Sequence, residues 1–115
     1  MTICEKLSNT LAPMNLTVAE GYYNGRDTEY FTFNVFSEHP VLAADDECIE
    51  EAAEAYLHYF TKDYSHSKKA QIKRLLELNE IYLIDIETLH EKDTGYTHLI
   101  FQIQITDYNE NESEE

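Results

Sequence analysis

The chain has 115 residues and a formal net charge of −15, which suits one domain with one core. A hydrophobic content of 43% excludes a chain that is disordered throughout, and the negative charge argues against direct binding to nucleic acid or to anionic membranes. No window is long and apolar enough to cross a membrane, and residues 1–14 lack the features of a secretory signal. We therefore expect a reducing compartment in which Cys4 and Cys48 are free thiols, with a disulfide between them as the alternative.

The first predicted element is a helix. Thr2 and Glu5 have the spacing of a capping box, and apolar side chains at helical intervals follow them. The pattern predicts a helix over about Ile3–Leu11, and Pro13 is expected to end it or to kink its last turn.

Two strands are predicted next. Leu16–Tyr23 and Glu29–Ser37 both alternate as strands do, and the Asn24–Gly25 pair between them predicts a hairpin turn. The second strand carries bulky side chains on both faces, so we expect it to be central in the sheet or covered on both sides. Pro40 is expected to stop its regular pairing.

The segment after this proline is ambiguous. Asp45, Asp46 and Glu47 predict a solvated acidic turn. Residues 48–55 are rich in Ala and Glu and have helical propensity, whereas the alternating aromatic run that follows favours a strand. We predict a strand over about Ala53–Thr61.

The last predicted elements are a helix and a two-stranded hairpin. Ser65 or Ser67 is expected to cap a helix that runs to about Asn79. Ile81–Leu89 and Tyr96–Thr106 are the predicted strands, joined by a loop that ends in glycine. In the helix, Ile72, Leu75 and Leu76 are predicted to face inward. One face of the first strand is predicted to carry Tyr82, Ile84 and Ile86, and one face of the second to carry Leu99, Phe101, Ile103 and Ile105.

The predicted order of elements is α-β-β-β-α-β-β. This order predicts an α+β fold in which the helices pack on a single antiparallel or mixed sheet. We expect one domain over residues 1–107 and a disordered acidic tail over residues 108–115, because Asn109–Glu115 contains no apolar side chain.

The sequence contains no recognisable catalytic or metal-binding motif. His90 and Glu91 begin like a zinc-protease motif, but Thr94 stands where the second histidine is required. The acidic run at 45–47 lacks the spacing and the glycine of a calcium loop. His98 is expected to be a surface or cross-strand residue rather than a metal ligand. We therefore predict no metal, no cofactor and no enzymatic activity.

Two groups of side chains suggest a contact surface. Half of the eight basic residues lie on one predicted helix, namely Lys68, Lys69, Lys73 and Arg74. They form either a solvated face or a positive patch, which in a ring of identical subunits can meet the acidic turn of the next copy. Tyrosine is enriched at interfaces, so Tyr22 and Tyr23, which precede the predicted hairpin turn, are added to the candidate contact residues. The candidate interface residues are Asp45, Asp46, Glu47, Lys69, Lys73, Tyr22 and Tyr23.

Several features follow one another along nearly the whole chain. The strand Tyr30–Ser37 is followed by Pro40 and by the acidic Ala44–Glu47, and the strand Tyr56–Thr61 leads into Phe60–Lys62. A basic amphipathic helix, a strand and a closing strand come next, at Ser67–Leu78, Tyr82–Leu89 and Tyr96–His98 with Phe101–Ile105. In this pattern the chain resembles the small tail-terminator or tail-completion (head–tail joining) proteins of long-tailed bacteriophages and prophages.

The resemblance implies a non-enzymatic structural protein of the virion. Proteins of this family form a hexameric ring at the head-proximal end of the tail tube, where the ring stops polymerisation of the tube and joins the head connector. The implied partners are further copies of the chain, the tail-tube protein and the head connector protein, with DNA only as cargo that passes through the ring and with no membrane. The implied location is the cytoplasm of the host bacterium during assembly, and then the virion tail. The resemblance leaves open whether the ring forms without the tail.

Two other functions stay open on the residues alone. The net charge also suits an acidic DNA mimic, or another small protein-binding inhibitor, with carboxylates spaced along an elongated surface. The alternating strands and the basic helix weigh against this alternative. An enzyme that uses Cys4 or Cys48 is the weaker hypothesis, because neither cysteine has a histidine beside it in sequence.

Overall fold

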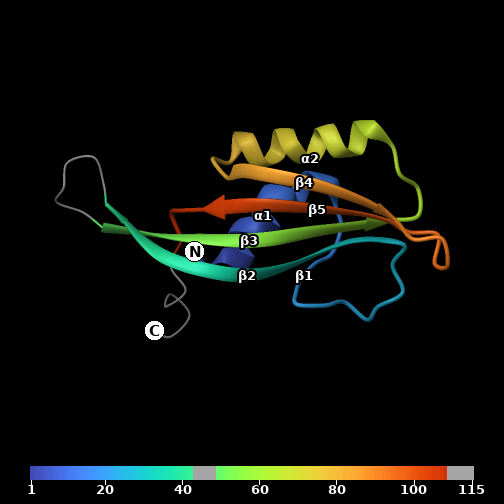
Figure 1. The fold of residues 1–115 in the computed structure, drawn as a ribbon, viewed down its shortest axis with the longest axis horizontal. Helices are drawn as coiled ribbons and strands as arrows, with labels where there is room; N and C mark the ends of the chain where they lie inside the picture. Colours follow the sequence, from blue (N-terminus) through green and yellow to red (C-terminus); the bar gives the residue numbers. More distant parts are fainter. Residues whose placement is uncertain (43–48, 109–115) are drawn as a thin grey trace.

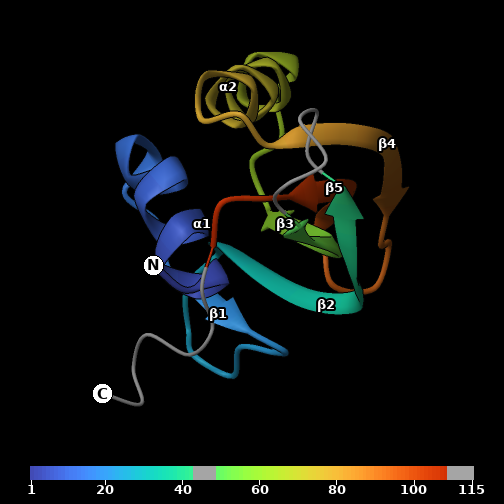
Figure 2. The ribbon, with the colours of Figure 1, turned by 90° about the vertical axis from the view of Figure 1, so that its left-hand side faces the viewer.

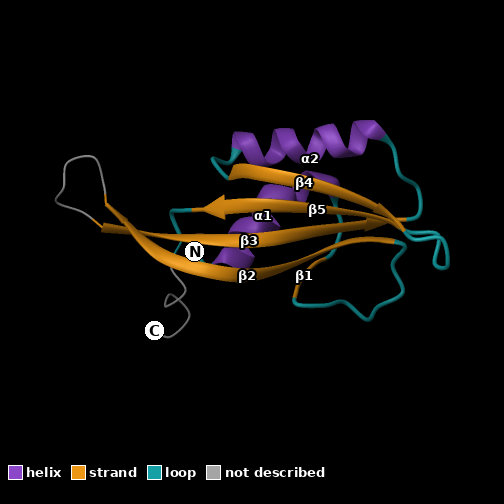
Figure 3. Ribbon diagram, in the orientation of Figure 1, coloured by secondary structure: helices purple, strands orange, loops and turns teal. Residues whose placement is uncertain are grey.

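The computed structural model of the protein describes residues 1–42 and 49–108. Its strands form one mixed sheet in the order β1-β2-β3-β5-β4 (Figure 1). Both helices lie on the same side of this sheet, as Figure 2 shows, and Figure 3 separates helices from strands by colour. The predicted α+β fold and the predicted order of helices and strands are confirmed. The elements are α1 (Ile3–Leu11), the 3₁₀ turn η1 (Ala12–Met14), β1 (Val18–Glu20), β2 (Glu29–Leu42), β3 (Ile49–Thr61), α2 (His66–Leu78), β4 (Tyr82–His90) and β5 (Thr97–Ile105).

The core lies between the two helices and the face of the sheet that they cover. Along β5 every second side chain is buried, as the alternation predicted, and the same face of β3 contributes Leu57 and Tyr59. Full burial of a large apolar side chain contributes about 1.5–3 kcal/mol, so this face supplies most of the stability of the fold. The helices close the core with Ile3, Leu7 and Leu11 from α1 and with Ile72 and Leu76 from α2.

Helix α1 begins and ends as predicted. The Thr2 hydroxyl accepts a hydrogen bond from the Glu5 N–H at 3.1 Å, and the Glu5 carboxylate accepts one from the Thr2 N–H at 3.1 Å. This capping box satisfies two N–H groups that have no partner within the helix. After Leu11 the chain tightens into η1, which contains Pro13, and Asn15 then adopts a left-handed conformation with φ 57°.

The connection into β2 differs from the predicted hairpin. β1 is shorter than expected and runs parallel to β2, with Val18 opposite Phe31. Two parallel strands cannot be joined by a tight turn, and residues 21–28, which include the Asn24–Gly25 pair, form the loop between them. Leu16 and Val18 pack against the core beside α1. This packing fixes the direction of β1, and it outweighs the local turn signal.

Pro40 does not end β2, contrary to the prediction from sequence. β2 pairs with β3 as far as Leu42, and Pro40 lies opposite Glu51. Alternate residues of an antiparallel strand turn their N–H groups away from the partner strand, so a residue without an N–H is tolerated at such a position on an open edge. The edge is open there because β1, the neighbour on that side, ends opposite Phe33.

Bulges shift the alternation of β2 and β4. Phe36 in β2 and Ile84 in β4 are the extra residues. As a result, Leu83 and Ile86 turn to the core, whereas Tyr82 and Ile84 are exposed. The prediction that Tyr82, Ile84 and Ile86 share one face of β4 is therefore wrong, because a pattern with a period of two cannot reveal a bulge.

The centre of the sheet is β3 rather than β2. The predicted strand over Ala53–Thr61 is confirmed and begins earlier, at Ile49, because pairing with β2 overrides the helical propensity of the Ala- and Glu-rich start. The end of α2 at Asn79 is as predicted, while Ser65 takes the N-cap position without making a side-chain capping hydrogen bond. The β4–β5 hairpin is confirmed, and Gly95 in its loop has φ 76°.

Candidate functional site

The predicted interface residues that the structure describes lie near opposite edges of the sheet. Lys69 and Lys73 are on α2, which contacts the edge strand β4, whereas Tyr22 and Tyr23 are in the loop that follows β1 at the other edge. The Tyr22 side chain is 78% exposed. The Tyr23 ring is half-buried, with its centroid 4.7 Å from that of Tyr30. The structure therefore does not bring the lysines and the tyrosines into one patch.

The other predicted residues lie outside the described part of the chain. These are Asp45, Asp46 and Glu47, and Cys48 lies there too. Their proposed pairing with α2 stays a prediction. Cys4 is a half-buried free thiol.

Helix α2 presents a basic surface to solvent. Lys68 is held within the molecule, because its Nζ lies 3.2 Å from Glu29 Oε2 and donates to the Asp63 carbonyl oxygen at 2.8 Å. No carboxylate among the described residues lies within ion-pair distance of Lys69, Lys73 or Arg74. The helix has no acidic residue in its first turn and no basic residue in its last turn. The charges at its ends therefore do not interact favourably with the helix dipole. We define Lys69, Lys73 and Arg74 as the α2 surface.

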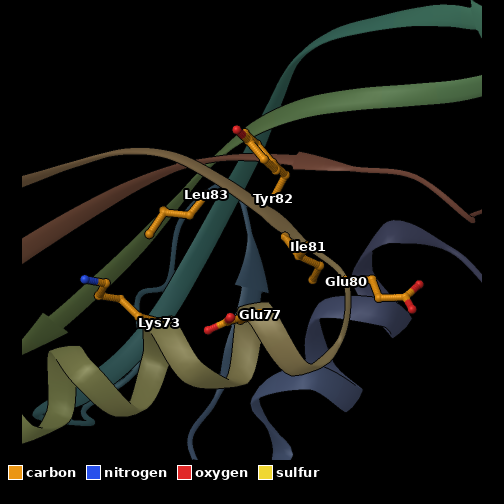
Figure 4. Close-up of a pocket in the computed structure, with 6 residues that line it drawn as sticks. All are labelled: Lys73, Glu77, Glu80, Ile81, Tyr82 and Leu83. Atoms are coloured by element: carbon orange, nitrogen blue, oxygen red, sulfur yellow. The ribbon is translucent and has the colours of Figure 1, made fainter.

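A groove of about 350 Å³ lies between the C-terminal half of α2 and the start of β4. Figure 4 shows Lys73 and Glu77 projecting from the helix, with Tyr82 pointing away from it. The Tyr82 side chain is 68% exposed and Leu78 is 66% exposed. The α2 surface is therefore bordered by large apolar groups in contact with water.

The face of the sheet away from the helices carries other types of side chain than the face that forms the core. It carries alternate residues of β2, β3, β5 and β4, which are aromatic, imidazole, amide, carboxylate and aliphatic side chains. No helix of the described residues covers this face (Figure 2). We call it the open face and define it by Tyr30, Asn34, Phe36, Tyr56, His58, Phe60, His98, Ile100, Gln102, Asp85, Glu87 and Leu89.

A hydrogen-bonded chain of side chains crosses the open face. His58 Nε2 lies 3.0 Å from Asn34 Oδ1, and His58 Nδ1 lies 2.8 Å from His98 Nε2. An amide oxygen can only accept, so His58 carries its proton on Nε2 and accepts on Nδ1 from the Nε2–H of His98. Burial lowers the pKa of both histidines, and for His58 the nearby His98 adds to the effect. The two hydrogen bonds require a neutral His58, and the lowered pKa values favour the neutral form of both rings.

Aromatic rings continue this chain towards the end of the sheet. The Phe60 ring stacks on His98 with centroids 4.1 Å apart, and on Tyr30 with centroids 4.9 Å apart. Tyr96 meets Phe60 edge to face, and Lys62 Nζ lies 5.1 Å from the centre of the Tyr96 ring. These contacts fix the side chains of the open face without a covering element, since offset and edge-on ring pairs are each stabilising.

The open face contains a hollow of about 260 Å³. Ile100 and Gln102 of β5 form its floor, because their neighbours across the strands are the other lining residues. Asp85 and Glu87 of the edge strand β4 line one side, and both are exposed. Tyr56 and His58 of the central strand β3 line the other side. The hollow thus combines the apolar side chain of Ile100 and the amide of Gln102 with two carboxylates, which suits a long cationic side chain.

The fold of the chain is similar to that of a known virion protein. A chain in the structure entitled "Virion of native gene transfer agent (GTA) particle" matches with a TM-score of 0.50 and 9% sequence identity, over 89% of this chain and 88% of that chain. No protein-family model matches the sequence. No curated protein matches it either.

The described part of the chain has neither a cluster of side chains for a metal ion nor a helix that could span a membrane. Within residues 1–42 and 49–108, no group of three or more His, Cys, Asp or Glu side chains is placed to hold a metal ion. None of the helices in that part of the chain has the length and apolar composition that a membrane span requires.

Sequence reasoning placed His98 correctly as a cross-strand residue but missed the hollow. The alternation of β3 already put Tyr56, His58 and Phe60 on one face. The sequence did not reveal the register between β3, β5 and β4. This register places His58 beside Ile100, and it places Glu87 on the other side of Ile100.

Proposed function

We propose that the chain is a structural protein of a phage or prophage virion, which caps the tail tube and joins the tail to the head as a ring of identical subunits. The observation that carries the proposal is the similarity of fold to a chain of the gene transfer agent virion over nearly the full length of both chains. The similarity of fold agrees with the sequence pattern that resembles tail-terminator proteins.

The surface of the molecule suits this role. The chain carries 23 acidic and 8 basic residues, and three basic side chains of α2 have no ion-pair partner among the described residues. A ring allows each copy to offer a basic patch to an acidic neighbour. The remaining negative charge would reduce sticking of DNA as it passes through the ring. The proposed role requires no catalytic residue, metal or cofactor.

Mass measurement in solution over a range of concentrations tests the ring. We expect self-association that rises with concentration, up to a hexamer, and binding of the chain to one end of tail tubes formed from the tail-tube protein of the same genome. Deletion of the gene is expected to give tubes of uncontrolled length and unjoined heads and tails in electron micrographs. A strict monomer that neither binds tubes nor changes their length would contradict the proposal.

A second candidate is an acidic inhibitor that mimics DNA. The net charge of −15 favours it, while the exposed basic α2 surface does not. Competition between the chain and DNA for a basic protein, in the absence of any tube binding, would support this candidate instead.

A further inference from the structure

We infer that the hollow of the open face receives the basic side chains of α2 from a neighbouring copy of the chain. The inference rests on the proposed ring, and it assigns the two surfaces that form the repeated contact. Neither surface depends on residues 43–48, where the sequence had suggested the acidic partner of α2.

The hollow has the chemistry of a receptor for lysine or arginine. Asp85 and Glu87 provide two exposed carboxylates, and no basic side chain among the described residues lies within ion-pair distance of either. The Tyr56 ring stands on the opposite side, where it can face a cation. Ile100 in the floor can contact the alkyl part of a long basic side chain.

The α2 surface has the matching properties. Lys69 and Lys73 are one helical turn apart on the same face, and Arg74 is adjacent. All three lack an ion-pair partner within the described residues, unlike Lys68, which is bound to Glu29. Leu78, beside them and 66% exposed, adds apolar area that a contact would remove from water.

The positions of the two surfaces allow a repeated contact between copies. α2 lies on the helix side of the sheet, next to β4 (Figure 2). The lining residues of the hollow lie on the open face, which is the other side of the sheet. One copy therefore cannot fill its own hollow with its own α2. A head-to-tail contact that uses both surfaces leaves one of each free at every step, and it ends only when a ring closes.

Charge reversal of each surface tests the inference. One variant carries Asp85→Lys and Glu87→Lys, and the other carries Lys73→Glu and Arg74→Glu. We expect each variant alone to associate at least about tenfold more weakly than the unmodified chain, because close charge pairs of this kind become repulsive. An equimolar mixture is expected to recover assembly, since each variant then presents the charge that the other requires.

The recovered rings are expected to contain the two variants in equal numbers, as strict alternation requires, and native mass spectrometry can measure these numbers. A control with Glu20→Lys and Asp93→Lys has the same change of net charge as the variant with Asp85→Lys and Glu87→Lys, at exposed positions outside both surfaces, and it is expected to assemble normally. Thermal unfolding of each variant verifies that the fold is kept.

The possible results distinguish failure of the contact between the two surfaces from failure of the proposed ring. Assembly of both variants alone, or folded variants whose mixture fails to recover, would overturn the pairing of surfaces while leaving the proposed ring intact. Failure of the unmodified chain to associate, alone or on tail tubes, would overturn the proposed ring and the inference with it. Recovery only with added tail-tube protein would assign the hollow to that protein and overturn the contact between copies.

Discussion

The two faces of the sheet are built from the same strands and differ in almost every property. The covered face carries Leu, Ile, Phe and one Tyr, which are closed against the helices. The open face carries imidazole, amide and aromatic groups that are ordered by hydrogen bonds and ring contacts, beside the exposed carboxylates of Asp85 and Glu87. A face needed only for folding would be covered or uniformly polar. The comparison teaches that the open face is organised beyond what the stability of the monomer demands.

Substitutions at two adjacent residues of β5 are expected to give the largest difference in the free energy of unfolding between the two faces. Phe101 is fully buried in the core, whereas Gln102 lies in the floor of the hollow. Phe101→Ala is expected to lower the free energy of unfolding by about 3–5 kcal/mol, and Gln102→Ala by less than about 0.5 kcal/mol. Urea unfolding of both variants measures the two values. Similar losses in both would show that the open face also holds the fold together.

Two tyrosines on β3, one on each face of the sheet, are expected to give the next largest difference in the free energy of unfolding. The Tyr59 hydroxyl is buried and donates a hydrogen bond to Glu29, whose carboxylate also meets Lys68. Burial, first, and then the bond to Glu29 raise the pKa of Tyr59 far above its ordinary value. Tyr59→Phe is expected to lower the free energy of unfolding by about 1–2 kcal/mol. Tyr56→Phe, on the open face, serves as the matched control and should change it by less than about 0.5 kcal/mol.

The histidine pair predicts a dependence of stability on pH. The pKa values of His58 and His98 are lower in the folded chain than their ordinary value of 6.5, so below about pH 6.5 the unfolded chain binds more protons than the folded chain. The free energy of unfolding should therefore fall as the pH decreases from about 7 to 5. The limit is about 1.4 kcal/mol per pH unit for each histidine, and Glu91 beside His98 reduces the effect.

Chemical unfolding at several pH values measures this slope. The variant with His58→Gln and His98→Gln should show a shallower slope over the same range, since the carboxylates common to both chains titrate mostly at lower pH. An unchanged slope in the variant would mean that other groups set the pH dependence.

The smallest effect is expected at the acidic wall of the hollow. Asp85→Asn with Glu87→Gln removes two exposed charges from an already acidic chain, so the free energy of unfolding should change by less than about 0.5 kcal/mol, or rise slightly. Thermal unfolding checks this value. A clear loss of stability would show that these carboxylates serve the fold rather than a partner.

The covered face was largely predictable from the sequence, and the open face was not. The buried alternation of β5 and the stripe of α1 follow from local periodicity, which reports burial directly. The parallel pairing of β1, the passage of β2 through Pro40 and the bulge at Ile84 depend on neighbours distant in sequence. The hollow depends on the register of three strands at once, and for this reason its residues could not be grouped from the sequence.

The bulges and Pro40 have a consequence for the behaviour of the chain at high concentration. Both strands with a long unpaired edge, β2 beyond Phe33 and β4, carry a bulge, and β2 also carries a proline. Each device interrupts the row of donors and acceptors that a further strand would need. Fibre growth by strand addition is therefore disfavoured at either end of the sheet. The chain would thereby be kept from forming amyloid at the concentrations at which its copies meet.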